Sequence, residues 1–206
     1  TGLHVPLIVH IPANVAKPGN YKPGTASDEV ISLIDITPTT LSFAGIERPK
    51  GMDGRIFLGD RLTPPRQYAF SARDRIDETV NRIRSVRGKR YHYIRNYYPD
   101  RHLTSLNRYK EKCFPIKPLM RRLMAEGKLT GPPAELMSPT VAPEQLFDTV
   151  NDPHEIHNLA DSDDPQHREA LIRMRAALSV WIVETQDQGV FPEPQEVVEP
   201  FEKEMH

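Results

Sequence analysis

Residues 82–97, RIRSVRGKRYHYIRNY, have the pattern of an antiparallel β-hairpin. Side chains of residues 82–87 alternate between two faces with a period of two, Gly88-Lys89 provides a tight turn, and residues 90–97 return as the partner strand. Tyr91 and Tyr93 fall on one side of that strand, so we expect them to pack in a core rather than stack on a ligand.

The flanking sequence predicts the rest of a small sheet. Residues 67–72 and 144–150 are candidate strands, and a proline-interrupted excursion over 98–140 separates the hairpin from the last of them. Within this excursion, residues 118–127 are expected to form a helix.

The best helix in the sequence begins at Asp164-Pro165 and runs to about Gln186. Its apolar residues recur at helical spacing, and they are Leu171, Met174, Leu178, Trp181 and Ile182. We therefore predict that residues 61–206 form a small C-terminal subdomain, an antiparallel sheet packed by a long C-terminal helix.

The first part of the chain has a different pattern. Leu3 to Ile11 is a nearly continuous apolar run, which is typical of a strand buried on both faces of a parallel sheet. Helices are expected over 28–34 and 37–45, but one strand with two helices cannot cover a parallel sheet. Residues 1–60 are therefore predicted to be the C-terminal end of an α/β domain whose other strands lie elsewhere, in a longer protein.

Composition restricts the possible classes of protein. The single cysteine, Cys113, excludes an internal disulfide, and no apolar run of about 18 residues predicts a membrane span. The net charge of −1 hides a strong segregation of charge along the chain. Residues 61–130 carry 18 Lys/Arg and 6 Asp/Glu, a net of +12, whereas residues 131–206 carry 4 and 16, a net of −12.

The hairpin carries much of this positive charge, on residues Arg82, Arg84, Arg87, Lys89, Arg90 and Arg95. Two interpretations stay open. The arginines pair with the acidic last third of the chain, or they form an exposed stripe that attracts a polyanion. No RNA-binding signature is visible, so a nucleic-acid partner is not expected.

Three segments, in this order, resemble the sulfatase family: residues 2–9 (GLHVPLIV), residues 30–55 with ISLIDITPT and MDGR, and residues 145–159 with QLFD, NDPHE and NL. The middle region, with residues 70–72 leading to the hairpin, is similar to the heparan N-sulfatase (N-sulfoglucosamine sulfohydrolase) group. The resemblance implies an alkaline-phosphatase-like α/β domain that ends near residue 60, followed by the small subdomain.

This resemblance also implies a function. The parent protein would hydrolyse sulfate esters or sulfamates of an anionic sugar or glycosaminoglycan, using a formylglycine and a divalent cation, usually calcium. The family's C-x-P-x-R motif and metal ligands precede the point where this chain begins. Cys113-Phe114-Pro115-Ile116-Lys117 has lysine in place of the arginine and lies downstream of the expected position. We therefore expect no catalytic residue, metal ligand or cofactor in this chain, and no activity from it alone.

The expected partners are the N-terminal part of the same sulfatase and a sulfated sugar; family resemblance would place the parent in the periplasm, outside the cell or in the lysosome. Candidate substrate-binding residues are His4, in the first segment, and five charged residues within 73–78, namely Arg73, Asp74, Arg75, Asp77 and Glu78. Arginine binds sulfate or carboxylate through two parallel hydrogen bonds, and carboxylates accept sugar hydroxyls. The alternatives are a solvated charged loop at 73–78 and, for the whole chain, a polyanion-binding or interaction module derived from a sulfatase tail.

Overall fold

The computed structural model describes residues 3–104 and 107–203. The chain forms two compact units, the first made of residues 1–70 with 87–91, and the second of residues 71–86 with 92–206. A functional division at residue 60 stays a prediction. Among the described residues, none of the helices has both the length and the apolar character that a membrane span requires.

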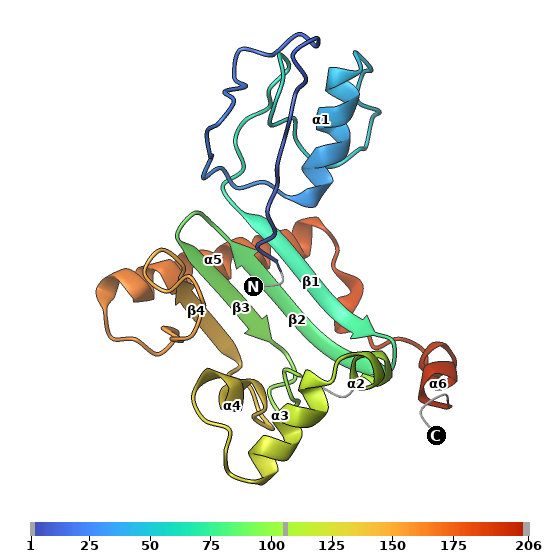
Figure 1. The fold of residues 1–206 in the computed structure, drawn as a ribbon, viewed down its shortest axis with the longest axis vertical. Helices are drawn as coiled ribbons and strands as arrows, with labels where there is room; N and C mark the ends of the chain where they lie inside the picture. Colours follow the sequence, from blue (N-terminus) through green and yellow to red (C-terminus); the bar gives the residue numbers. More distant parts are fainter. Residues whose placement is uncertain (1–2, 105–106, 204–206) are drawn as a thin grey trace. The chain divides into compact units, whose positions relative to one another are not determined.

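A four-stranded antiparallel sheet runs through the middle of the chain (Figure 1). Its strands lie in the order of the sequence: β1 (Ala69–Ile76), β2 (Thr79–Arg87), β3 (Tyr91–Asn96) and β4 (Glu144–Asp148). The hairpin predicted over 82–97 is confirmed as β2 and β3. The buried Tyr91 and Tyr93 confirm the expected core packing.

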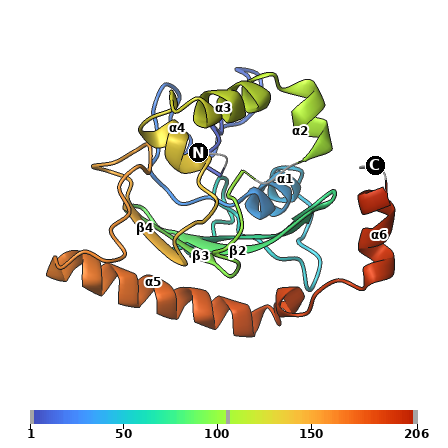
Figure 2. The same cartoon turned by 90° about the horizontal axis from the view of Figure 1, so that it is seen from below.

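Helices cover both faces of this sheet in the second unit (Figure 2). The long helix α5 (Pro165–Glu184) begins at Asp164, whose carboxylate accepts a hydrogen bond from the amide of Gln166, as an N-cap does. It buries Leu171, Met174 and Leu178 and lies along one face, which confirms the predicted packing. The opposite face carries α2 (Arg108–Cys113), α3 (Ile116–Ala125) and α4 (Pro132–Leu136). After α5 the chain continues through a 3-10 turn, η2 (Gln188–Val190), to α6 (Gln195–Lys203).

The strand predicted for Leu3 to Ile11 does not form in this chain. Residues 3–11 are irregular. The apolar side chains of residues 3–9 are exposed, up to 88% for Ile8, whereas Ile11 is buried. A strand needs neighbours that pair with its backbone amides and carbonyls. Among the described residues no strand pairs with this segment, so the apolar pattern stays without the sheet that it predicts.

The helix expected over 28–34 is also wrong. Val30 forms an isolated antiparallel bridge with Arg66, and only a 3-10 turn, η1 (Leu33–Asp35), precedes α1 (Ile36–Phe43). The second helix is confirmed, one residue earlier than expected. Gly45 ends it at φ +70°, in the left-handed region that glycine adopts without steric cost.

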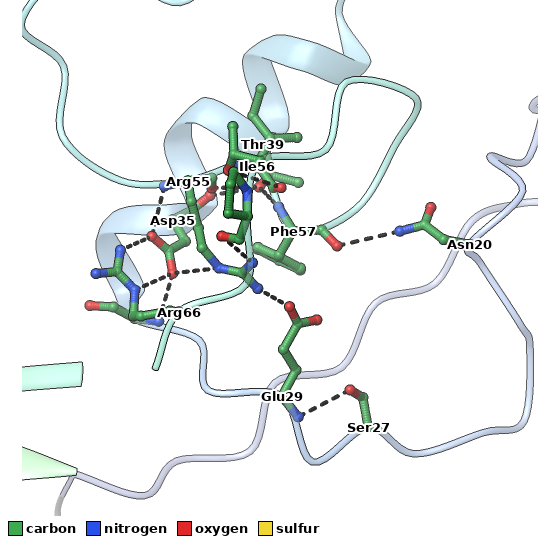
Figure 3. A network of polar contacts seen from close by, with 12 residues as sticks. Asn20, Ser27, Glu29, Asp35, Thr39, Arg55, Ile56, Phe57 and Arg66 are labelled. Carbon is green, nitrogen blue, oxygen red and sulfur yellow. Dashed lines mark hydrogen bonds and ion pairs between the residues drawn. The ribbon is translucent and has the colours of Figure 1, made fainter. Parts of the chain in front are cut away.

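A buried carboxylate organises the first unit (Figure 3). Asp35 is fully buried and accepts hydrogen bonds from the amides of Ser32 and Arg55, each at 2.9 Å, and from both Nε and Nη2 of Arg66. Burial alone would raise the pKa of Asp35, but the hydrogen bonds from Arg66 and the two amides outweigh it and leave that pKa below its ordinary value. The guanidinium of Arg55 pairs with Glu29.

Gly54 lets the following residues approach this centre. It has φ +96°, and a Cβ at this position would lie 2.3 Å from the carbonyl oxygen of Ile34. No other residue type fits there without moving backbone, so the MDGR segment requires its glycine.

Candidate functional site

The charged residues 73–78 are the end of a strand and a turn, not a solvated loop. Residues 73–76 belong to β1, and Asp77-Glu78 connect it to β2. Asp77 has φ +51°, a left-handed conformation that aspartate tolerates better than most residues. The strand alternation then directs Arg73 and Arg75 away from the side of Asp74.

Asp74 forms part of a buried ion cluster. Its two carboxylate oxygens accept hydrogen bonds from Nη1 and Nη2 of Arg84, at 2.8 and 3.0 Å. Asp187 accepts from Nε and Nη2 of the same arginine, at 2.7 and 2.8 Å. The Arg84 side chain is 0% exposed, and the hydrogen bonds that it donates to Asp187 and then to Asp74 raise its pKa above the ordinary value. The positive charge of Arg84 is therefore neutralised inside the protein.

The two carboxylates at the turn hold the start of α2. The side-chain amide of Asn107 donates to Asp77 Oδ2 at 3.0 Å, and the backbone amide of Arg108 donates to Glu78 Oε1 at 2.6 Å. Asn107 is itself the N-cap of α2, because its Oδ1 accepts from the amide of Lys110 at 3.1 Å. The turn thereby sets the position of this short helix.

Arg75 contacts the C-terminal tail. Its guanidinium pairs with the carboxylate of Glu193 and donates to the carbonyl oxygen of Asp77 at 2.8 Å. Together with the pair of Arg84 and Asp187, this contact joins the basic middle of the chain to its acidic last third. Arg84 is one of the six hairpin residues to which the pairing interpretation applies, and its pair with Asp187 confirms that interpretation for Arg84; Arg75 lies outside that set.

Arg73 lines a cavity, unlike the other charged residues within 73–78. It lines a cavity of about 140 Å³, here called the cationic cavity, whose lining residues are Arg73, Ile76, Thr79, Leu103, Thr104, Asn107, Lys110 and Lys117. Three of these carry positive charge, and none of the described lining residues is a carboxylate. Burial lowers the pKa of Arg73.

His4 lies in the exposed segment of the first unit. The structure thus groups five of the six predicted residues on one hairpin of the second unit, and their roles in substrate binding stay predictions. The sequence patterns do not identify Lys110 or Lys117 as candidate binding residues. Lys117 drew attention only because it departs from a cysteine motif, and no periodic pattern links either lysine to residue 73.

A second hollow, of about 370 Å³, lies between the sheet and α5, lined by Tyr93, Arg95, Tyr97, Glu144, Arg175, Leu178, Ser179 and Ile182. Glu144 accepts hydrogen bonds from Arg175 Nε at 2.8 Å and from the hydroxyl of Tyr93, and it pairs with Arg95 at 2.9 Å. Arg175 is the main cause that lowers the pKa of Glu144 to about 2, while burial and Glu144 raise the pKa of Tyr93 to about 12. These groups satisfy one another.

The Glu144 cluster gives the protein a measurable acid sensitivity. Because the pKa of Glu144 in the folded protein, about 2, lies below its ordinary value of 4.5, its stabilising effect is complete above pH 4.5 and is lost as the pH falls toward 2. Glu144→Gln should lower the free energy of unfolding by about 1–2 kcal/mol at pH 7, since its arginine partners are partly exposed.

Urea unfolding at pH 7, 4.5 and 3 measures this effect, and the variant should lose less stability between pH 4.5 and 3 than the wild type does. Glu169→Gln is the matched control, because Glu169 is 79% exposed in its pair with Arg173 on α5. Equal effects of the two substitutions at every pH would contradict the assignment.

The residues nearest in type to a sulfatase nucleophile or metal site lack the arrangement that such a site requires. Cys113 is exposed at the end of α2, and Lys117 occupies the position that the motif requires for arginine. Within residues 3–104 and 107–203, no three His, Cys, Asp or Glu side chains are grouped as a metal site requires. In the His154-to-His157 segment, Asp152 accepts hydrogen bonds from the amides of Ile156 and His157, each at 2.7 Å, and so holds a turn. The described residues therefore fit neither formylglycine nor calcium, and no chemical step is derived from them.

Comparison with known proteins agrees with the resemblance in the sequence. Residues 2–112 match the family described as N-sulphoglucosamine sulphohydrolase, C-terminal. Two ulvan-active sulfatases of Formosa agariphila are similar: one is 35% identical over 194 residues (94% of this chain, 31% of the relative), the other 30% identical over 169 residues (79% and 30%). The chain thus spans about 31% and 30% of the length of these relatives. The solved structure of BT1596, a 2-O GAG sulfatase, superposes with a TM-score of 0.47 at 23% identity, over 74% of this chain and 25% of that one.

Proposed function

Because this chain belongs to the family of N-sulphoglucosamine sulphohydrolase C-terminal regions, we propose that it works within a sulfatase that hydrolyses sulfate esters or sulfamates of an anionic sugar or glycosaminoglycan. In that protein it contributes scaffold and substrate-binding residues, and the nucleophile and the cation ligands come from the N-terminal part.

The observation that carries this proposal is the extent of the family match. It covers residues 2–112, so it includes nearly all of the first unit, the strands β1 to β3, and Lys110 of α2, which lines the cationic cavity. The two curated relatives, both named sulfatases, support sulfate hydrolysis as the reaction. The sulfamate or sulfate of an amino sugar is supported by the family's description alone.

The contacts within the hairpin support a binding role for a rigid surface. Asp74, Asp77 and Glu78 each hold another part of the second unit in place, through Arg84, Asn107 and the amide of Arg108 respectively. A substrate group that binds beside them therefore meets side chains whose positions are already set, which lowers the entropic cost of binding.

An activity measurement tests the proposed division of labour. The purified 206-residue chain, supplied with calcium and either a chromogenic sulfate ester or N-sulfoglucosamine, should release no sulfate above the rate without protein. The same chain joined to the region encoded upstream of Thr1, after formylglycine formation, should release sulfate from at least one of them.

Two results would contradict this proposal. One is turnover by the 206-residue chain alone. The other is an upstream coding sequence that contains neither a C-x-P-x-R motif nor a pair of aspartates for a cation.

A further inference from the structure

The cationic cavity brings together three positive charges from three different elements. Arg73 comes from β1, Lys110 from α2 and Lys117 from the first turn of α3. A separate contact fixes each lysine. Asn107 caps the turn of α2 that carries Lys110, and Lys117 Nζ donates to the carbonyl oxygen of Thr104 at 3.1 Å. The convergence of these charges is therefore a consequence of the fold.

Within the described part of the chain, no carboxylate lines the cationic cavity to balance these three positive charges. The Nε of Arg73 is buried and has no hydrogen-bond partner, although a buried guanidinium normally pairs all of its donors. Burial, and then the positive charges of Lys110 and Arg73, lower the pKa of Lys117. The nearby carboxylates are engaged elsewhere. Asp74 accepts hydrogen bonds from Arg84, and Asp77 and Glu78 accept hydrogen bonds from the start of α2.

Such a site is costly while it is empty and becomes favourable when an anion enters. Like charges that are partly removed from water repel one another, and a buried donor without a partner destabilises the folded state. The cavity, at about 140 Å³, has room for a tetrahedral oxyanion and a few waters, since a water occupies about 30 Å³ in the liquid. An oxyanion would accept from Arg73 Nε and from both ammonium groups at once.

We propose that the cationic cavity binds one sulfate group of a sulfated sugar, through Arg73, Lys110 and Lys117, as a docking site separate from the sulfate that is cleaved. The assignment to a sugar rests on the proposed function, whereas the affinity for a sulfate oxyanion rests on the cavity alone. The separation from cleavage follows from the donor set, because the described lining residues include no cysteine or serine that could become a formylglycine and no carboxylate that could hold a cation.

Sulfate binding can be measured directly at Arg73. In the ¹⁵N-labelled 206-residue chain, titration with inorganic sulfate should shift the Nε–H resonance of Arg73, at constant ionic strength maintained with chloride. Arg73→Met, Lys110→Met and Lys117→Met should each weaken sulfate binding about tenfold or more, because each removes a charge-assisted hydrogen bond. Lys117→Arg, which keeps the charge, should retain most of the affinity.

Matched controls remove one positive charge from the same helices outside the cavity. Lys112→Met on α2 and Arg122→Met on α3 should change sulfate affinity less than twofold, because both side chains are exposed and neither lines the cavity. Thermal unfolding of each variant shows whether it is folded. The resonance of Arg73 in the wild type provides a test that requires no variant.

The outcomes separate the two parts of the proposal. An unmoved Arg73 resonance, or equal losses in the cavity variants and the controls, would overturn the site. If inorganic sulfate binds in the cavity but a sulfated disaccharide binds no better than its desulfated counterpart, the assignment to a sugar is overturned. Failure of catalysis by the joined polypeptide, with the cavity still binding sulfate, would count against the proposed function alone.

Discussion

Replacing Asp187 with alanine is expected to lower the free energy of unfolding by about 3–5 kcal/mol, the range for breaking a buried ion pair. The reason is that Arg84 is 0% exposed and, of its two described carboxylate partners, would keep only Asp74, whose side chain is 47% exposed. An arginine inside the protein without sufficient counter-charge cannot lose its proton, so the cost appears as instability. Urea unfolding, followed by the fluorescence of Trp181 and by circular dichroism, measures this loss.

Asp74→Ala is the internal comparison for this prediction. It removes the other partner of Arg84, but water can replace the exposed carboxylate in part, so the expected loss is smaller, about 1–2 kcal/mol. A side chain at Gly189 should also destabilise this cluster, because a Cβ there would lie 1.7 Å from Arg84 Nη2. If Asp187→Ala costs no more than Asp74→Ala, Arg84 does not depend on Asp187 as the geometry indicates.

Replacing Asp35 with asparagine should destabilise the first unit by about 3–4 kcal/mol. The carboxylate is 0% exposed, and its charge faces the guanidinium of Arg66 and lies 3.8 Å from Arg55 Nε. Asparagine keeps one acceptor but supplies an NH₂ group where Asp35 accepts hydrogen bonds. Because the pKa of Asp35 is below its ordinary value, the wild type should also lose this stabilisation as the pH falls, and the variant should not.

Hydrogen exchange provides the measurement for Asp35, because it reports stability segment by segment. Amides of α1 should exchange much faster in Asp35→Asn, while those of α5 serve as the reference within the same molecule. Asp28→Asn is the control variant, since its pair with Lys89 is mostly exposed and should contribute little to stability. Unchanged protection of α1 would show that the charge of Asp35 is not what holds this unit.

The candidate site was predictable from the sequence as a location and not as a set of contacts. Five charged residues within 73–78 marked a candidate binding segment, and Arg73 does line the cationic cavity. The two lysines that complete the cavity lie on α2 and α3, and no local pattern indicates that these helices return to β1. Conversely, Asp77 and Glu78 looked like acceptors for a sugar, but in the structure they accept hydrogen bonds from the start of α2.

The failure of the predicted first strand has a related cause. An apolar run such as Leu3 to Ile11 indicates burial, but it does not contain the strands that would bury it. The apolar side chains of residues 3–9 are exposed in the described structure, and under the proposed function the strands that would bury them belong to the N-terminal part of the sulfatase.

The sequence by itself determined the hairpin β2–β3 and the helix α5 with its Asp164 cap, because each of these depends on residues that are near one another in the chain. It also determined membership in the sulfatase family, through three short segments that occur in the family's order. Only the tertiary structure decided which charges are neutralised and which remain available. Arg84 and Asp187 are 103 positions apart, and Arg73 meets Lys117 only because β1 and α3 fold together. The sequence gives the charge of each side chain, whereas the fold determines which opposite charge lies within hydrogen-bonding distance of it.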